Sequence, residues 1–429
     1  MRSPVLFPRI VLSLLVFLVL PLQAEAPVTP TIIISFDGFR WDYIDRFETP
    51  HIDRVIREGF RVKRVKPSFP SLTFPNHVSL LTGLHPHRHG IVGNHIYDPV
   101  LQREFHSSAA TGTDDPQWYR APMLWEIARE AGMKTAAFFW VGSEMQGRHP
   151  DRFFKFTYKI PISKRLDQLE RWLDPANHPS PELMLLYFFE SDTAGHDHGP
   201  VSQEVKACVA ELDAAVGRIT RMLEKHKREA HLLFVSDHGM TPMLGKGLSL
   251  KKIKDSVPAD HFDRLIHNWS IVDLFVKNPT AERIDKVLTN LPTSPHIKWY
   301  RREAVPHPTH PMRNGHIMGL LATGTQVLEQ EWSDVKGGHG FDIDHPDMGA
   351  TCFGRSPATK PGSVLERTDI VDFFPLVLHL MKLPQREVDG RLAVWSPILR
   401  DPSGRESKPM DRKKAGQDAD NSGLGANGQ

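Results

Sequence analysis

Three aspartates in this sequence each follow a short apolar segment. They are Asp37, Asp192 and Asp237, which follow residues 31–36, 182–189 and 231–236. Apolar runs of this length predict buried strands, and the carboxyl ends of parallel strands meet at one edge of a sheet, where ligands bind. A single aspartate after a strand is usually a turn or helix-cap residue. Three of them predict a shared crevice lined by carboxylates.

Histidines stand close to these aspartates at spacings that suit metal ligation. Asp192 and His196 are four residues apart, so one helical turn places both on the same face. His238 directly follows Asp237, and His339 lies between two glycines. Oxygen and nitrogen ligands without a thiolate suit zinc, with manganese or iron as alternatives. Each motif alone also occurs in ordinary loops, but together they predict a metal centre.

Thr73 introduces a segment that we expect to be helical over residues 78–82. On helix propensity alone, this threonine is an N-cap residue. It is also a candidate nucleophile, because a metal ion activates a hydroxyl that is otherwise unreactive, and a helix start favours an anionic phosphate. Both roles remain open at this point, and one side chain could serve both.

The elements that would position these residues alternate between strands and helices. We expect strands at residues 31–36, 134–140, 182–189 and 231–236, and helices at residues 123–132, 201–225 and 369–381. This alternation predicts an α/β fold with a mostly parallel sheet sandwiched by helices. Residues 245–335 are rich in proline and histidine and have weaker turn signals. We expect them to form an irregular insertion or an irregular part of the same domain.

The composition is that of a globular protein, with 40% hydrophobic and 24% charged residues. These values exclude a mostly disordered or fibrous chain. The 53 Lys and Arg against 51 Asp and Glu give a formal net charge of +2, which argues against specific nucleic-acid binding. Two cysteines are too few for a disulfide scaffold or a cysteine zinc site. Cys208 and Cys352 could pair in an oxidising compartment or remain separate buried thiols.

Residues 1–26 are typical of a signal peptide. Arg2 and Arg9 give a basic start, residues 10–20 are mostly apolar, and Ala24-Glu25-Ala26 offers a small-residue cleavage site. The apolar run is short for a helix that spans a membrane. We therefore expect an exported protein, periplasmic or secreted, without a stable membrane span after cleavage. A catalytic domain over residues 27–398 would be followed by a disordered tail over residues 399–429.

Seven short motifs resemble those of a known family. They are SFDGFR (residues 35–40), TFPNH (73–77), LTGLHP (81–86), HGIVGN (89–94), DTAGH (192–196), DHGM (237–240) and GHGFD (338–342). In this order they are similar to the nucleotide pyrophosphatase/phosphodiesterase family of the alkaline phosphatase superfamily, in its bacterial type. The resemblance extends over nearly the whole mature domain. It departs from the family pattern at Ile343, where the family usually has asparagine.

The resemblance implies two zinc ions and a set of site residues. One ion would be held by Asp37, Thr73, Asp237 and His238, and the other by Asp192, His196 and His339. Thr73 would be the nucleophile, and Asn94 would donate a hydrogen bond to a phosphate oxygen. Phe74 and a second aromatic residue would flank a nucleobase. Phe156 fits the second position because Pro161 lies five residues beyond it, with Tyr158 as an alternative.

The implied function is hydrolysis of small-molecule nucleotide phosphodiesters or pyrophosphates through a phospho-threonine intermediate. A choline-lipid phosphodiesterase, a phosphonate hydrolase and a phosphomonoesterase are alternatives that would use the same site. An inactive exported binding module belongs to a different class of protein and would be marked by a lost ligand. All seven expected ligands are present, which favours an enzyme.

Overall fold

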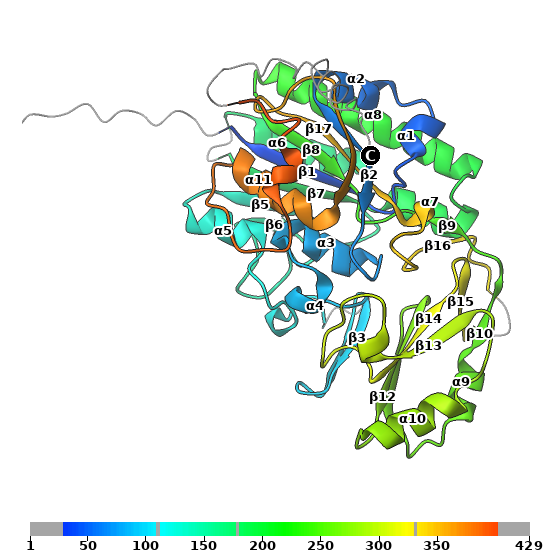
Figure 1. Ribbon diagram of the computed structural model, residues 1–429. Coiled ribbons are helices and arrows are strands. Elements are labelled where there is room, and N and C mark those ends of the chain that lie inside the picture. Colours follow the sequence, from blue (N-terminus) through cyan, green and yellow to red (C-terminus); the bar gives the residue numbers. More distant parts are fainter. Residues whose placement is uncertain (1–28, 109–111, 177–179, 330–332, 402–429) are drawn as a thin grey trace, which may run out of the picture.

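The computed structural model describes residues 29–108, 112–176, 180–329 and 333–401. At its centre is an eight-stranded sheet (Figure 1). Its strands, in spatial order, are β18 (Ser363–Asp369), β2 (Phe60–Lys66), β17 (Ala350–Arg355), β8 (His231–Val235), β1 (Thr31–Phe36), β7 (Leu183–Phe188), β5 (Thr135–Phe138) and β6 (Arg152–Phe154). All neighbouring strands run parallel except at β17, which is antiparallel to both β2 and β8. The prediction of a mostly parallel sheet is confirmed.

Helices cover both faces of this sheet. One face packs against α1 (Tyr43–Arg46), α2 (Pro50–Glu58), α6 (Ile162–Leu173) and α8 (Gln203–Lys225), and the other against α3 (Thr73–Thr82), α5 (Leu124–Glu130) and α11 (Phe373–Leu380). Successive side chains of a strand point to opposite faces, so Ile32 and Ile34 lie in one hydrophobic core and Ile33 in the other. Both cores are buried, which explains why the central strands are apolar throughout rather than alternating.

A second, smaller unit lies below the sheet in Figure 1. It contains an antiparallel sheet in the order β11 (Phe262–His267), β12 (Ile271–Val276), β14 (Ile317–Leu321) and β13 (Ile297–Arg301), with α9 (Leu250–Ser256), α10 (Ala281–Asn290) and the parallel pair β10 (Lys246–Ser249) and β15 (Thr325–Leu328). Val272, Leu274 and Ile317 belong to its own buried core. The described part of residues 245–335 is therefore more regular than the sequence indicated. The sequence hid these strands because β11 and β13 carry charged residues and are only partly buried.

The remaining elements connect these two sheets and cover their edges. They are α4 (Pro86–His89), β3 (His95–Asp98), β4 (Arg103–His106), α7 (Glu190–His198), β9 (Thr241–Pro242) and β16 (Gly337–Gly338), with short 3₁₀ helices at Pro116–Trp118, Arg302–Ala304, Pro346–Met348, Ile370–Asp372 and Leu392–Trp395. The predicted helix over residues 369–381 is thus a 3₁₀ turn followed by α11. The hairpin of β3 and β4 lies beside the smaller unit (Figure 1).

The predictions for the ends of the chain are tested only in part. The signal-peptide segment lies outside the described residues. At the other end, the Arg400 N–H donates to the Ala358 carbonyl at 2.9 Å, and Leu399 pairs with Thr359 in an isolated bridge. The folded domain therefore includes residues 399 and 400, and the predicted start of the tail at residue 399 is wrong. No helix in the described part of the chain is long and apolar enough to cross a membrane.

The two cysteines are unpaired. Cys352 lies in the core on one face of the sheet, whereas Cys208 packs against the core on the other face. The sheet between them excludes a disulfide. Of the two alternatives left open by the sequence, separate thiols are the one observed.

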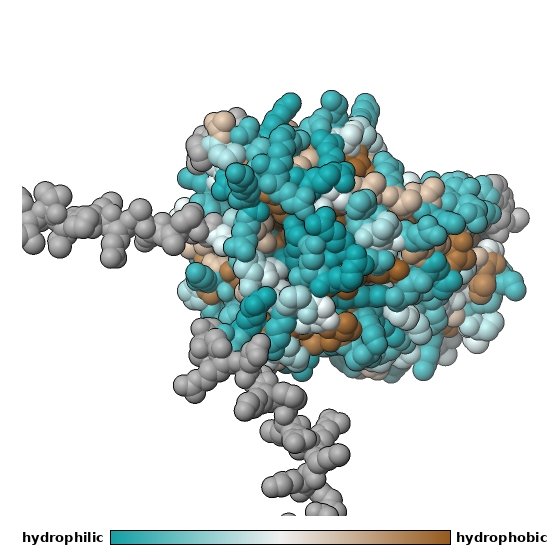
Figure 2. All heavy atoms as spheres, turned by 90° about the horizontal axis from the view of Figure 1, so that it is seen from above, coloured by the Kyte–Doolittle hydropathy of each residue, from teal (hydrophilic) through white to brown (hydrophobic). Residues whose placement is uncertain are grey.

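The face seen from above, over α2 and α8, is mostly hydrophilic, with hydrophobic residues in small separate patches (Figure 2). Both helices turn their apolar sides toward the sheet, where Val55 of α2 and Val216 of α8 are fully buried. This distribution is expected of amphipathic helices at a solvent-exposed surface.

Candidate active site

The three aspartates that follow strands lie at one edge of the large sheet. β1 pairs with β7 on one side and β8 on the other, and all three strands end at the same edge. Asp37 and Asp237 follow β1 and β8, whereas Asp192 lies in the first turn of α7, after β7. The Gly38 N–H donates to Asp237 Oδ1 at 3.2 Å, and a Cβ at Gly38 would lie only 2.9 Å from Asp192 Oδ1. The predicted convergence of the three carboxylates is confirmed.

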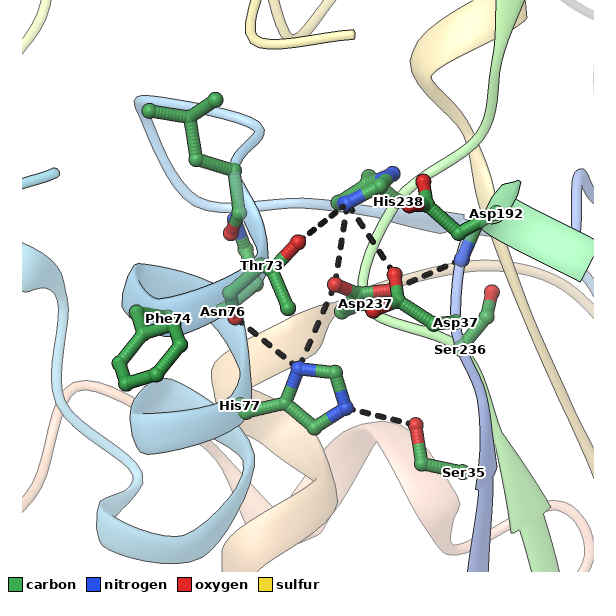
Figure 3. Close-up of polar contacts among 12 residues, drawn as sticks. Ser35, Asp37, Thr73, Phe74, Asn76, His77, Asp192, Ser236, Asp237 and His238 are labelled. Atoms are coloured by element: carbon green, nitrogen blue, oxygen red, sulfur yellow. Dashed lines mark hydrogen bonds and ion pairs between the residues drawn. The ribbon is translucent and has the colours of Figure 1, made fainter. Parts of the chain in front are cut away.

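Asp37, Asp237 and His238 form one group of side chains that could hold a metal ion (Figure 3). His238 Nε2 lies 3.0 Å from Asp237 Oδ2 and 3.4 Å from Asp37 Oδ1. Thr73 Oγ1 lies 3.3 Å from the same nitrogen. The four side chains that the resemblance assigns to one ion are therefore close neighbours.

Asp192, His238 and His339 form a second such group. His196 is adjacent to it, since His196 Nε2 lies 3.4 Å from Asp192 Oδ2 and 3.2 Å from His339 Nε2. The geometry thus brings all seven predicted ligands together. It differs from the expected division in one respect, because His238 is within reach of both groups. The assignment of each ligand to a particular ion stays a prediction.

Each of the three histidines is oriented by a backbone carbonyl on its far side. The Nδ1–O distances are 2.8 Å for His196 and Gly337, 2.9 Å for His238 and Gly239, and 3.1 Å for His339 and Ser71. A ring that donates its Nδ1–H to a carbonyl presents the lone pair of Nε2 on the opposite side. All three Nε2 atoms therefore face the carboxylates, as metal-binding histidines do.

Three buried carboxylate oxygens of the site receive no hydrogen bond from the described residues. They are Asp37 Oδ1, Asp192 Oδ1 and Asp237 Oδ2. An ionised oxygen buried without a compensating partner is costly. A cation in each of the two ligand groups would satisfy them, one between Asp37 Oδ1 and Asp237 Oδ2 and the other at Asp192 Oδ1. The donor set, with only oxygen and imidazole nitrogen, therefore fits a metal such as zinc.

The pKa shifts of these groups reflect crowded negative charge in a buried space. Burial, reinforced by the charges of Asp237 and Asp192, raises the pKa of Asp37 well above its usual range. Burial also opposes ionisation of Asp237, but the neighbouring histidines hold its pKa well below the usual range. Burial lowers the pKa of His339 to about 3. Burial also tends to lower the pKa of His196, but the neighbouring Asp192 carboxylate outweighs it and raises this pKa to about 8.

Thr73 is the first residue of α3, and Leu72 occupies the N-cap position. The interpretation of Thr73 as an N-cap residue is therefore wrong, and its hydroxyl lies against His238 instead. The loop before the helix is fixed by the buried Asn76 side chain, which accepts from the Ser68 N–H at 2.7 Å and donates to the Leu72 carbonyl at 2.9 Å. This loop holds the threonine hydroxyl at the edge of the metal-ligand groups.

His77 is a buried residue of the site to which the sequence analysis gave no role. Its Nε2 lies 2.8 Å from Ser35 Oγ, and its Nδ1 lies 2.9 Å from the Thr73 carbonyl oxygen and 3.3 Å from Asp237 Oδ2 (Figure 3). It thereby connects β1, the start of α3 and one of the carboxylates. Its position four residues after Thr73, on the same helix face, is the signal that could have identified it.

Asp37 is held by two further residues that sequence analysis missed. The Tyr187 hydroxyl donates to Asp37 Oδ2, and the Ser191 hydroxyl donates to the Asp37 carbonyl at 2.5 Å. Tyr187 belongs to the apolar strand β7, where a sequence pattern identifies it only as a core residue. Ser191 lies in the first turn of α7.

Asn94 and Phe74 are joined by a hydrogen bond. Asn94 Oδ1 accepts from the Phe74 N–H at 3.0 Å, which leaves the Asn94 NH₂ group as a donor. The Phe74 ring is partly buried and packs edge-on against Phe105, with ring centroids 5.5 Å apart. Both predicted residues therefore lie next to Thr73.

Phe156 and Tyr158 belong to an exposed aromatic cluster beside the carboxylates. Their exposed fractions are 37% and 72%, and their ring centroids lie 4.8 Å apart. Phe156 also packs against Tyr187, the residue that donates to Asp37. Partial burial, together with the charges of Asp192 and Asp37, raises the pKa of Tyr158.

Comparisons with known proteins agree with this geometry. The model of the family described as "Type I phosphodiesterase / nucleotide pyrophosphatase" matches residues 31–342. Human ectonucleotide pyrophosphatase/phosphodiesterase family member 5 is 29% identical over 370 residues, which cover 84% of this chain and 76% of the human protein. A venom phosphodiesterase of Crotalus durissus collilineatus is 27% identical over 406 residues, which are 87% of this chain and 47% of the venom protein.

Solved structures of the same family superpose on the chain. The human family member 5 structure has a TM-score of 0.80 at 27% identity and covers 87% of this chain and 100% of that one. The murine counterpart, solved as an inactive threonine-to-alanine variant in complex with AMP, has a TM-score of 0.79 at 26% identity and covers 86% of this chain and 100% of that one. The chain therefore belongs to the type I phosphodiesterase/nucleotide pyrophosphatase family of the alkaline phosphatase superfamily, and is a phosphodiester-hydrolysing enzyme.

Proposed function

We propose that this enzyme cleaves nucleotide phosphodiester or pyrophosphate bonds with two zinc ions and a covalent phospho-Thr73 intermediate. The observation that carries the proposal is the position of Thr73 Oγ1, 3.3 Å from His238 Nε2 at the edge of the six other converging ligand side chains. A serine or threonine hydroxyl needs such an activating neighbour, since it is a weak nucleophile by itself.

One ion would be held by Asp37, Thr73, Asp237 and His238, and the other by Asp192, His196 and His339. The carbonyl-oriented histidines and the unpartnered carboxylate oxygens support this assignment. The chemistry that zinc supplies at such sites is activation of a hydroxyl and neutralisation of charge on the transferred phosphate.

The reaction would proceed in two displacements at phosphorus. The Thr73 oxygen attacks phosphorus, and the bond from phosphorus to the leaving oxygen breaks. Water then attacks the phospho-threonine and releases Thr73. Two in-line displacements give net retention of configuration at phosphorus. A threonine at the start of a helix is well placed for this role, because the helix dipole favours a negative phosphate there.

Asn94 would orient the phosphate. Its Oδ1 is occupied by the Phe74 N–H, so its NH₂ group is the part that can donate to a non-bridging phosphate oxygen. The same hydrogen bond fixes Phe74 beside the nucleophile. Phe74 on one side and Phe156 or Tyr158 on the other would then stack on the base of a nucleotide.

The AMP complex of the murine relative supports a nucleotide as the group retained on phosphorus, since AMP is what remains after the leaving group has departed. The description of that threonine-to-alanine variant as inactive supports the proposed role of Thr73. A base slot that works by stacking would accept nucleotides as a class rather than one base.

We further propose that the protein is exported and cleaved near Ala24 or Ala26. The basic start and the short apolar run of residues 1–26 support export. The names of the relatives agree, since one is an ectonucleotide enzyme and another a venom protein. Amino-terminal sequencing of the exported protein tests this proposal, and an intact Met1 on a membrane-bound protein would contradict it.

The substrate class is tested by initial rates on three esters, with bound metal measured on the same sample. The esters are a nucleotide 5′-phosphodiester, a choline-phosphate ester and a simple phosphomonoester. We expect the nucleotide diester to be turned over with the highest kcat/KM. Preference for the choline-phosphate ester would overturn the proposed substrate, and full activity in a metal-free sample would overturn the proposed site.

A further inference from the structure

The turn between β11 and β12 brings three consecutive residues of the smaller unit into contact with the catalytic site. The turn consists of residues 268–270. Asn268 Oδ1 accepts from the His95 N–H at 2.7 Å, and its Nδ2 donates to the His95 carbonyl at 2.9 Å, which ties the turn to the loop that carries Asn94. Ser270 Oγ lies against Gly340, the neighbour of His339, so closely that any side chain at this glycine would collide with it.

Trp269, between these two residues, lies beside His196, which adjoins the second group of metal-ligand side chains. Its indole ring meets the His196 ring edge-on, with centroids 5.3 Å apart at 71°. The side chain remains 43% exposed, so contact with His196 covers only part of it. A large aromatic side chain that is held at a site and left open to solvent is a candidate binding surface.

The backbone of Trp269 is held in a conformation that tryptophan rarely adopts. Its φ is +59°, in the left-handed region that favours glycine. The turn is rigid all the same, because the Trp269 carbonyl accepts from the Val327 N–H at 2.8 Å and the Ser270 carbonyl from the Leu321 N–H at 2.9 Å. Such strain in a non-glycine residue, next to a functional site, points to a role for the side chain.

The position of Trp269 relative to Thr73 indicates which part of a substrate it would meet. Thr73 lies against His238, whose ring stacks on His339, and His339 in turn adjoins His196 and then Trp269. Trp269 thus lies on the side of the second group of ligands, whereas Thr73 contacts His238 at the first. In an in-line displacement the leaving group departs on the side opposite the attacking oxygen. Phe74, by contrast, lies beside Thr73.

We propose that Trp269 forms a leaving-group subsite, which stacks on a planar leaving group such as the base of a second nucleoside. This inference rests on the proposed function, since it assumes that Thr73 is the nucleophile. It assigns the smaller unit a part in substrate selection: the larger domain binds the retained nucleotide, and the turn at residues 268–270 selects the group that is released.

The test uses two diesters that carry the same retained 5′-nucleotide. One has a nucleoside 3′-oxygen as leaving group, and the other has the same sugar without its base. The wild-type enzyme should prefer the base-bearing diester by about tenfold in kcat/KM, within the range of a single base–aromatic stack. Trp269→Gly should bring the ratio close to one. Phe74→Ala should lower both rates and keep the ratio.

Stability separates this role from a structural one. Trp269→Gly relieves the left-handed backbone, which offsets the lost ring contact and the greater freedom of the unfolded chain, so the melting temperature and the bound metal should stay near those of the wild type. Met312→Ala, which removes another exposed side chain between β13 and β14, should leave the ratio unchanged. If Trp269→Gly left the kcat/KM ratio of the two diesters unchanged, for example by slowing both equally, the inference would be overturned.

Failure of the proposed function would be distinguishable from failure of this inference. If the wild type hydrolysed neither diester, the proposed function would be rejected. The affinity of the Thr73→Ala variant for the two diesters, with and without Trp269→Gly, would still test the subsite. Tighter binding of the base-bearing diester that disappears in Trp269→Gly supports the subsite. An affinity that changes neither with removal of the base nor with Trp269→Gly rejects it.

Discussion

The imidazole rings of His238 and His339 stack on each other, with centroids 3.6 Å apart and planes 13° from parallel. The two residues follow different strands, β8 and β16, and the resemblance assigns them to different metal ions. Their contact makes the two ligand groups a single cluster in which His238 is shared.

This shared position leads to different expectations for the two histidines. His339→Ala should remove one metal ion per chain, because the first group of ligands stays complete. His238→Ala should remove the ion that it holds with Asp37, Thr73 and Asp237. It should also weaken the other site, because its ring stacks on His339 and its Nε2 lies within reach of both groups. Elemental analysis of the purified variants measures the difference. His198→Ala, which removes an exposed histidine of the same helix as His196, is the control and should keep both ions.

Thr73→Ala should abolish turnover and leave the metal content and the melting temperature nearly unchanged, because it removes the reacting oxygen and only one of seven ligands. Thr73→Ser keeps a hydroxyl at this position and should retain measurable activity. Trapping with a radiolabelled phosphodiester, followed by acid quenching, should label the wild-type protein and not the alanine variant. Near-native turnover by Thr73→Ala would rule out the covalent mechanism.

His77→Ala should lower kcat much more than it raises KM. The ring of His77 fixes the backbone of Thr73 and touches Asp237, so its loss would displace reacting groups without removing a contact to the substrate. We expect a loss of about 10- to 100-fold, as for other residues that support metal ligands. Ser35→Ala, which removes only the hydrogen bond to His77 Nε2, should have a smaller effect. A change confined to KM would show that His77 acts on the substrate instead.

Phe74→Ala and Phe156→Ala should raise KM for nucleotide esters and spare small aryl phosphodiesters. Loss of one base–aromatic stack costs ~1–3 kcal/mol in single-stranded nucleic-acid sites, which sets the scale of the effect. Tyr158→Ala measured on the same two substrates decides which member of the exposed pair faces the base. Equal losses on both substrates would mean that these rings shape the site in general.

The large sheet could be predicted from the sequence because its central strands are buried on both faces. Strands β1, β7 and β8 are continuous apolar runs, which stand out from their surroundings. Strand β2, with the sequence FRVKRVK, carries basic residues along its length and was not predicted. The same reason applies to β11 and β13 of the smaller unit, which are exposed on one side.

The residues of the site also fall into those that a sequence pattern identifies and those that it does not. The metal-ligand residues could be predicted because Asp192 and His196, or Asp237 and His238, carry their relationship in their spacing. His77 could have been identified from its spacing of four residues from Thr73. Tyr187 and Trp269 act through contacts with residues far away in the chain, and an isolated aromatic residue has no pattern that separates it from an ordinary core or surface residue.

Asp273 of β12 gives a prediction about stability. Its carboxylate is 5% exposed and accepts from the Gly315 N–H at 2.8 Å and from Asn314 Nδ2 at 3.3 Å. Burial outweighs these hydrogen bonds and raises the pKa of Asp273 to about 6. Because the folded form holds its proton more tightly than the unfolded form, the folded state loses stability as the pH rises from about 4 to about 6 and does not regain it above.

Asp273→Asn keeps an acceptor oxygen for Gly315 and cannot ionise. It should therefore stabilise the protein at about pH 7.5, by up to about 3 kcal/mol for a pKa raised by roughly two units, and have little effect near pH 4. The measurement is the melting temperature of both proteins across this range, with Asp263→Asn, an exposed carboxylate on the neighbouring strand, as the control. A stabilisation that does not grow with pH would show that the pKa of Asp273 is not raised by folding, because its hydrogen-bond donors satisfy it as an anion.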